Sequence, residues 1–570
     1  MSYFRKLVII LAFTNFAGNI FAQSKDFDIT KNLEIFFSAL RELQNNYIDS
    51  LSTEQLIAYA LEGITEHLDP YTKYVPAEQQ TDFDFQTTGK YAGIGSLIQK
   101  DSGCILVAGP YRNLPADKAG LVAGDKIMEI DGKTTSVMSV NKASSLLKGD
   151  ANTVVKLKVL KLRTGELADL SITRENIRVP SVPYSNIYEN GTGYIRFPSF
   201  TVGSSNDIRN VLTEFRATGN LKSLILDMRG NGGGPLVEAV GILNLFLPKG
   251  ITVVTSSGRK KETEEKYVTR ENPVEPDLPL VILVDNSSAS ATEIVSGTIQ
   301  DLDRGIIVGT NTFGKGYVQS VRPIGYDAQL TYTIAKYYIP SGRCVQAHNF
   351  ATFSSDGSVS FIPDSLKKEF KTKNGRTVFD AGGVTPDVVI RGEEYSPMAV
   401  SLMRKNLIFK YSIEYFRKNQ TSPPPDSLEI TEPEYQDFIN YLSDKEYDYQ
   451  TASEMTMKRL INAAKQEKYY DNAKNSFDEL NALLKHDKAK DLRINQEELV
   501  SLLREEISER YYYEEGRLEA MLRRDKQFDE AYNILNNPDK YNKLLNNPTT
   551  TAHNFKKDSN NYGKIFRSEK

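Results

Sequence analysis

The chain has 570 residues, which is too long for one ordinary hydrophobic core, so several domains are expected. Hydrophobic residues make up 40% of the sequence and charged residues 25%, as is typical of globular proteins. The formal net charge of −4 provides no general attraction to nucleic acid or to an anionic membrane, so no nucleic-acid partner is expected. The two cysteines and four histidines are scattered, which argues against a disulfide framework and against a zinc site. We therefore expect neither a bound metal nor a cofactor.

Residues 1–22 have the features of a secretory signal peptide. Arg5 and Lys6 form a short basic segment, an apolar run covers residues 7–17, and Ala22 offers a small residue for cleavage. A membrane anchor is the alternative, but the apolar run is shorter than the roughly 20 residues that span a bilayer. The sequence thus predicts an exported protein with no integral membrane segment after signal cleavage.

Residues 23–85 are predicted to form a helical N-terminal region. Apolar residues recur at helical spacing in residues 33–47 and 56–64, and Pro70 ends the pattern. From Tyr91 onward, short β-like runs alternate with glycines. This texture predicts a β-rich domain over residues 86–175.

Residues 176–392 are predicted to form an α/β core, because short apolar strands alternate with helical stretches. The expected strands cover residues 224–226, 281–284 and 305–308, and the expected helices cover residues 237–247 and 291–302. Beyond residue 393 the sequence is charged and helical, with a proline break at residues 423–425 and a last strong helix over residues 497–522. The fold class expected for the whole chain is therefore multidomain α/β, with helical regions at both ends.

Ser290 is the best candidate for a nucleophile. It lies in the Ser-rich segment 286–293, between a predicted strand and a predicted helix. The backbone N–H of Ala291 would then lie at a helix N-terminus, where it faces developing negative charge. The alternative is that Ser290 merely caps the helix, as serines in such segments usually do.

A serine nucleophile needs a base, and Lys315 is the better candidate because two flanking glycines allow a close approach of its backbone. Ser–Lys pairs are a known variant of the catalytic triad. Gln319 lies four residues later and could orient the lysine amine. His67 and His348 stay open as bases because catalytic partners meet in space, and an exposed Lys-Gly turn is the ordinary alternative for Lys315.

Two glycine-rich segments follow predicted strands. Residues 309–315 fit a phosphate-binding P-loop up to its lysine, but Gly316 stands where Ser or Thr should bind magnesium, so nucleotide hydrolysis is not expected. Residues 227–234 end in three glycines, whose N–H groups could form an oxyanion hole. A flexible strand-to-helix connection is the alternative for the second segment.

Together these segments resemble the carboxyl-terminal processing peptidases, which are also called tail-specific proteases. The resemblance runs from about residue 33 to residue 391. It rests on the segments around Ser290, Lys315 and Gln319, on residues 227–234, and on residues 337–343 and 382–387. It implies that Ser290, Lys315 and Gln319 are catalytic.

Three residues depart from the family's pattern. Thr292 stands where serine is common, Gly230 where asparagine is common, and Gly232 where proline is common. These departures leave the chemistry intact but blur which glycine serves the oxyanion. We expect Gly233 and Ala291 to form the oxyanion hole.

The β-rich insert resembles a PDZ domain. Its segment Ala92, Gly93, Ile94 and Gly95 looks like the loop that binds a peptide's terminal carboxylate, and residues 115–125 look like the helix and turn of protease PDZ domains. A PDZ domain adds an extended peptide to a strand edge, so free C-terminal tails would be preferred. A β-barrel without a binding role is the alternative.

The resemblance implies an exported serine endopeptidase of the bacterial periplasm or cell envelope. Its substrates would be proteins with unstructured C-terminal tails, and an adaptor protein is a further candidate partner. The rival interpretation is a non-catalytic PDZ-containing peptide-binding or scaffold protein, which would have no use for Ser290, Lys315 and Gln319.

Overall fold

The computed structural model describes residues 27–101, 103–260, 262, 264–353 and 359–546. The predicted signal peptide, residues 1–22, lies outside the described residues. None of the helices in the described ranges is long and apolar enough to cross a lipid bilayer. The chain divides into two units, residues 1–80 with 319–334, and residues 81–318 with 335–570.

The first unit contains the predicted N-terminal helices. Residues 27–46 are helical, and α2 (Thr53–Glu66) begins at Ser52, whose side chain accepts a hydrogen bond from the N–H of Gln55 at 3.3 Å. The short strand β1 (Lys73–Val75) pairs antiparallel with residues 329–331 of β18 (Ala328–Tyr338). The helical part of this prediction is confirmed, whereas the pairing with a segment some 250 residues later has no local signal.

The part of the second unit that resembles a PDZ domain, called the PDZ part below, contains a six-stranded sheet in the order β3-β4-β5-β7-β8, with β6 paired to β5. Its elements are α3 (Gln80–Thr88), β2 (Lys90–Gly93), β3 (Ser96–Asp101), β4 (Cys104–Pro110), α4 (Pro115–Lys118), β5 (Lys126–Ile130), β6 (Lys133–Thr134), α5 (Val140–Leu147), β7 (Val154–Leu160), β8 (Leu167–Thr173) and β9 (Glu175–Arg178). Strands β2 and β9 pair antiparallel, which brings the two ends of this part together. Alternate side chains of β4, β5 and β7 fill its core.

The α/β core of the second unit is built on a six-stranded sheet in the order β10-β11-β12-β15-β16-β23. The strands are β10 (Tyr184–Ile187), β11 (Thr192–Arg196), β12 (Ser223–Asp227), β15 (Leu280–Val284), β16 (Ile306–Gly309) and β23 (Val388–Val389). All neighbours pair in parallel except β10 with β11. Both β12 and β15 are buried along their whole length, as expected for parallel strands covered on two faces.

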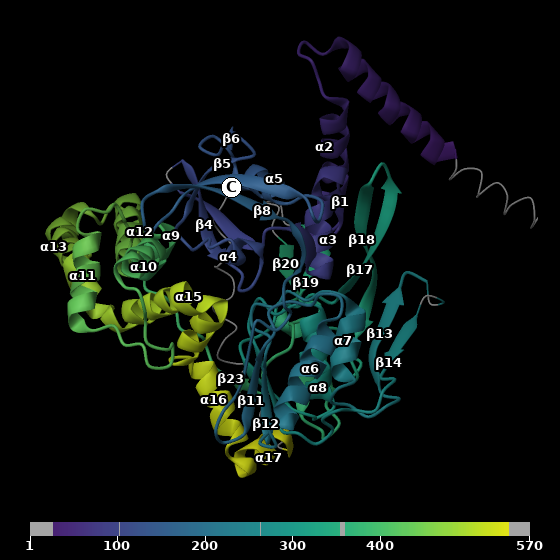
Figure 1. Cartoon of the computed structure of the whole chain (residues 1–570). Helices are drawn as coiled ribbons and strands as arrows, with labels where there is room; N and C mark the ends of the chain where they lie inside the picture. Colours follow the sequence, from purple (N-terminus) through teal and green to yellow (C-terminus); the bar gives the residue numbers. More distant parts are fainter. Residues whose placement is uncertain (1–26, 102, 261, 263, 354–358, 547–570) are drawn as a thin grey trace, which may run out of the picture. The chain divides into compact units, whose positions relative to one another are not determined.

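Helices cover both faces of this sheet (Figure 1). On one face lie α6 (Ser204–Ala217), α7 (Leu236–Leu243) and α8 (Ala291–Asp301). On the other face, α16 (Lys526–Leu535) and α17 (Pro538–Asn546) pack against Ile225, Val281 and Val308. The last two helices of the described residues, which the sequence assigned to a separate helical region, therefore complete the core.

The remaining described strands are β13 (Thr252–Gly258), β14 (Glu265–Val268), β17 (Tyr317–Gly325), β19 (His348–Phe353), β20 (Val359–Phe361), β21 (Glu369–Lys371) and β22 (Thr377–Phe379). Strand β17, whose residues 319–325 belong to the first unit, pairs with β18. Two separate antiparallel pairs are β19 with β20 and β21 with β22. In the second unit, β13 pairs with β14 and with residues 335–338 of β18.

The C-terminal helices before α16 form their own core and also contact the PDZ part. They are α9 (Pro397–Arg404), α10 (Leu407–Lys418), α11 (Glu432–Leu442), α12 (Ala452–Gln466), α13 (Lys474–Leu484), α14 (Lys488–Ile494) and α15 (Gln496–Leu522). Phe409 and Ile413 of α10 pack on Leu106 of β4, and Lys410 forms an ion pair with Asp101 at 2.7 Å. The PDZ part is therefore packed against the C-terminal helices.

Candidate active site

The predicted nucleophile, Ser290, lies in the turn between β15 and α8, where the sequence analysis placed it. Its φ of 56° is rare for a residue with a side chain and costs about 1–3 kcal/mol, so surrounding contacts must hold it. The residue is half-buried, and the N–H of Ala291 begins α8. A helix N-terminus carries partial positive charge, which favours an anion at this turn.

The carboxylate of Glu293 joins the segments of the predicted nucleophile and the predicted base. Its Oε2 accepts hydrogen bonds from the N–H groups of Ser290 and Lys315, both at 2.8 Å. Its Oε1 accepts from the Gly314 N–H at 2.7 Å and from the Thr312 hydroxyl at 2.6 Å. Burial raises the pKa of Glu293, and the four donors oppose that rise. One oxygen thus receives the N–H groups of both residues, so their backbones lie side by side.

Tyr337 ties the same two segments together from β18. Its buried hydroxyl lies 2.9 Å from the carbonyl oxygen of Lys315 and 3.2 Å from that of Ser290. The N–H of Phe313 also donates to the carbonyl of Ser288 at 2.9 Å. Neither Glu293 nor Tyr337 was predicted as a site residue from the sequence, because a capping glutamate and a strand tyrosine have ordinary structural roles.

These bonds also explain why residues 309–315 are not a phosphate site. In a P-loop, the backbone N–H groups before and at the lysine bind phosphate oxygens. Here the N–H groups of Gly314 and Lys315 donate to the Glu293 carboxylate instead. The anion in this cradle is a side chain of the protein.

The glycine-rich segment 227–234 lies against the Ser290 turn. The carbonyl of Asn231 accepts from the N–H of Ala289 at 2.9 Å and from the hydroxyl of Thr292 at 2.8 Å. A Cβ on Gly233, whose φ is 95°, would lie 2.7 Å from the Ala289 carbonyl oxygen and 2.9 Å from the Ser290 Cβ. Only glycine therefore fits at position 233. Thr292, which stands where serine is common in the family, keeps the hydroxyl bond to the Asn231 carbonyl.

The N–H of Gly233 itself donates to the Asn231 side chain at 2.9 Å. It could serve an oxyanion only if this bond were shared or exchanged. Its place as the second donor therefore stays a prediction, as does that of Ala291.

A buried network of ion pairs includes Asp227 and Arg229 of the glycine-rich segment. Arg229 donates to Asp227 at 2.5 Å and pairs with Asp525, the N-cap of α16, at 2.6 Å. Arg196 pairs with Asp227 at 3.1 Å. Although burial opposes ionisation, Arg229 and Arg196 hold the pKa of Asp227 well below its ordinary value. The C-terminal helices thus reach the base of the predicted oxyanion segment, a contact with no signal in the local sequence.

The alternative bases have other surroundings. His67 lies exposed in the first unit, with Nδ1 2.7 Å from the Gly63 carbonyl oxygen. The His348 ring packs against Phe313 and Phe361, its Nδ1 has no hydrogen-bond partner in the part of the chain that the structure describes, and burial lowers its pKa.

Gln319 belongs to the first unit, on β17. Its Nε2 lies 3.4 Å from the Thr333 hydroxyl. Its role toward Lys315 stays a prediction.

The predicted carboxylate-binding loop of the PDZ part precedes an edge strand. Among the described strands, β3 pairs with β4 alone, and α5 packs beside it. Three carbonyls of the loop accept hydrogen bonds from backbone N–H groups: Ala92 from Gly149, Ile94 from Ala116, and Gly95 from Tyr111.

Gly95 has a φ of 73°, and a Cβ there would lie 2.6 Å from the Leu114 Cβ. Gly93 ends β2, paired with Glu175. An unpaired strand edge beside a helix is the geometry that strand addition requires.

Comparisons with known proteins agree with this architecture. Residues 191–352 match the sequence model of Peptidase family S41, residues 106–161 that of the PDZ domain, and residues 398–535 that of the probable PDZ-protease C-terminal helical domain.

Several bacterial proteases are similar to the chain. A carboxy-terminal-processing protease of Bartonella bacilliformis is 34% identical over 319 residues, covering 55% of this chain and 73% of that protein. The carboxy-terminal processing protease CtpA of Bacillus subtilis is 31% identical over 308 residues, covering 54% of this chain and 65% of that protein. A probable CtpA-like serine protease of Staphylococcus aureus is 32% identical over 344 residues, covering 59% of this chain and 68% of that protein.

Proposed function

Because the chain belongs to the carboxy-terminal-processing proteases, which are serine-type peptidases with a PDZ domain, we propose that it cleaves substrates through a Ser290–Lys315 dyad. The observation that carries the proposal is the Glu293 carboxylate, which receives the N–H groups of both residues at 2.8 Å. A binding protein would gain nothing from holding a strained serine and a half-buried lysine together.

The proposed reaction uses side chains and backbone groups of the protein alone. Ser290 Oγ attacks the peptide carbonyl carbon and gives its proton to the neutral amine of Lys315, which Gln319 orients. The N–H of Ala291, together with that of Gly233, stabilises the oxyanion. The Lys315 ammonium then protonates the leaving amine, and water hydrolyses the acyl-enzyme.

The proposed substrates are proteins with unstructured C-terminal tails. The tail would pair with the free edge of β3, and the N–H groups of residues 92–95 would bind its carboxylate. Only an extended segment can add to a strand edge, which excludes folded termini. The C-terminal helices are the proposed surface for an adaptor or another partner.

We also propose export to the bacterial periplasm or cell envelope. The basic segment, apolar run and small residue within residues 1–22 support this proposal. The measurement is N-terminal sequencing of the protein recovered from the cell envelope. A mature chain that still begins at Met1 would contradict it.

The dyad is tested by the cleavage of a protein with a flexible tail, in the presence of a chelator. Ser290→Ala and Lys315→Ala should each abolish turnover, because the nucleophile and the base act as one unit. Gln319→Ala should be intermediate, and His348→Ala should retain most activity. An inactive His348 variant beside an active Lys315 variant would replace the dyad with a histidine mechanism.

A further inference from the structure

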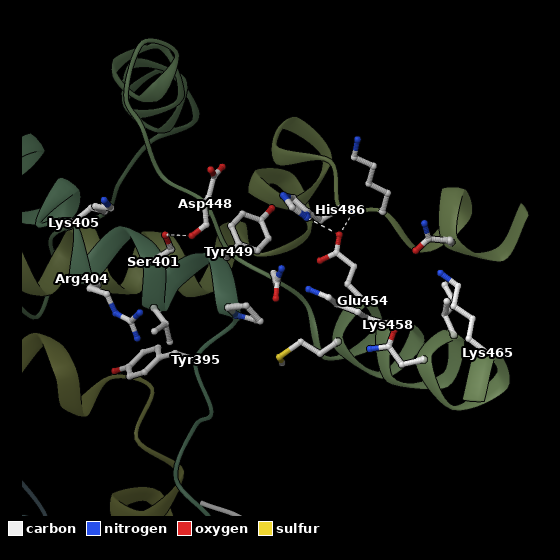
Figure 2. Close-up of a pocket in the computed structure, with 18 residues that line it drawn as sticks. Tyr395, Ser401, Arg404, Lys405, Asp448, Tyr449, Glu454, Lys458, Lys465 and His486 are labelled. Atoms are coloured by element: carbon white, nitrogen blue, oxygen red, sulfur yellow. Dashed lines mark hydrogen bonds and ion pairs between the residues drawn. The ribbon is translucent and has the colours of Figure 1, made fainter. Parts of the chain in front are cut away.

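A large groove lies among the C-terminal helices, away from Ser290 and from the PDZ strand edge. Its volume is about 1560 Å³, and it runs between α9 and α12 (Figure 2). Ser401 and Arg404 come from α9, Lys405 directly follows that helix, and Lys458 and Lys465 come from α12. Small-molecule sites usually measure about 300–1,000 Å³, so this groove suits a larger ligand.

Apolar side chains line the groove and stay exposed. Met455 is 42% exposed, Val400 39% and Tyr395 46%, and Ile461 also lines the groove. Residues 455, 458, 462 and 465 recur at three- and four-residue spacing, so they share one face of α12. This face is about 15 Å long, the length of roughly ten residues of helix.

Basic side chains dominate the charged groups of the groove. They are Arg404, Lys405, Lys458, Lys465 and Lys485, against the two carboxylates of Asp448 and Glu454.

Both carboxylates already have partners. Asp448 forms an ion pair with Lys488 at 2.8 Å, and Glu454 lies 2.8 Å from Nδ1 of His486. Glu454 also accepts from the N–H of Thr451 at 2.8 Å, as the capping glutamate of α12. Both acidic side chains of the groove therefore already pair with neighbouring groups of the protein.

The cations lack such partners. Within the described ranges, no carboxylate lies within ion-pair distance of Arg404, Lys458, Lys465 or Lys485. Lys465 instead lies over the Tyr470 ring, 4.8 Å from its centroid. The groove thus combines exposed apolar side chains with unneutralised positive charge on both α9 and α12.

We propose that this groove binds an amphipathic acidic segment of a partner protein, as a helix of about ten residues. Leucine-like side chains of the segment would cover Val400 and Met455, while its Asp and Glu side chains would pair with Arg404 on one wall and Lys458 on the other. The exposed apolar side chains favour a peptide over nucleic acid, whose phosphate backbone would leave them uncovered. The site is independent of the proposed peptidase chemistry.

The proposal is tested with the full chain carrying Ser290→Ala, so that a peptide probe is not cleaved. The probe is a fluorescent synthetic helix of about 12 residues, with Leu and Glu at helical spacing, and its dissociation constant is measured by anisotropy. A second probe has every Glu replaced by Gln. The charge-reversal variant is Arg404→Glu with Lys458→Glu, and the matched control is Arg459→Glu, an exposed neighbour on α12 that does not line the groove.

The reversal should weaken binding by about tenfold or more, because two attractive pairs become repulsive. Met455→Ser should weaken binding by about threefold through lost apolar contact, and Arg459→Glu should change it less than about twofold. Added salt should weaken the Glu probe, and the Gln probe should bind at least about tenfold less tightly. Circular dichroism checks that each variant is folded.

Three results would overturn the proposal. The first is the absence of saturable binding of the Glu probe to the Ser290→Ala chain. The second is an equal loss of binding in the Arg459→Glu control. The third is tighter binding of a duplex DNA or of an anionic lipid vesicle at the same residues, which would assign the groove to another class of ligand.

Discussion

Glu293→Gln is the substitution that most directly tests how the active site is held together. The wild-type carboxylate accepts four hydrogen bonds, two at each oxygen. Glutamine has the same shape, but one of its two terminal atoms becomes an NH₂ group. If that group takes the place of Oε2, it faces the N–H groups of Ser290 and Lys315, and donors then meet donors.

The expected loss of stability follows from these hydrogen bonds. Hydrogen bonds to a charged group contribute about 1.5–3 kcal/mol each, so two lost bonds cost roughly 3–6 kcal/mol. Removing a fully buried charge recovers part of this, which leaves a net loss of about 2–4 kcal/mol in the free energy of unfolding. Domains have about 5–15 kcal/mol of stability, so the variant should still fold. Activity should fall further, because a displacement of about 1 Å between reacting groups can cost about 100-fold in rate.

The assay compares kcat on a tailed substrate, measured well below the melting temperature of the variant, with a thermal unfolding scan. Thr292→Ser is the matched control, since it keeps the hydroxyl bond to the Asn231 carbonyl and loses one buried methyl, at a cost of about 1 kcal/mol. A Glu293→Gln protein with wild-type kcat and wild-type stability would refute the role of the carboxylate in joining the proposed nucleophile to the proposed base.

Other substitutions test the surroundings of the site. Gly233→Ala should inactivate the enzyme, because φ is 95° and the new Cβ would lie 2.7 Å from the Ala289 carbonyl oxygen. A Cβ at Gly232 would have no neighbour within 4 Å, so Gly232→Ala should retain activity. Equal activities of the two variants would contradict this prediction. Asp525→Asn should weaken the 2.6 Å ion pair with Arg229 and reduce kcat several-fold. The affinity for C-terminal peptides, measured under conditions without cleavage, should not change. An unchanged kcat would show that α16 does not position the predicted oxyanion segment. Burial raises the pKa of Glu505 from 4.5 to about 7, so the folded state binds a proton that the unfolded state releases between these values. Stability should therefore fall as pH rises from about 4.5 to 7. Glu505→Gln should remove this fall and raise the melting temperature at pH 8 by a few degrees, for roughly 1–2 kcal/mol. If the stability of the variant depended on pH as that of the wild type does, Glu505 would not be the group responsible.

The order of the parts and the candidate catalytic residues could be predicted from local patterns in the sequence. The apolar runs that became β12, β15 and β16, and the helix α8, were predicted within one or two residues, because periodicity and burial pattern are local properties. Membership of the peptidase family was likewise readable, since its segments are short and contiguous. Ser290 was placed in its turn for the same reason.

Which of these groups contact one another could not be predicted without the folded chain. The pairing of the Ser290 and Lys315 segments through Glu293 depends on two loops that follow the neighbouring parallel strands β15 and β16. The pair between Arg229 and Asp525, and the packing of α16 and α17 on the sheet, join segments separated by hundreds of residues. Such contacts carry no signal in the local sequence, because a buried carboxylate or an amphipathic helix can be satisfied by many partners. The choice among those partners is made by the packing of the whole chain.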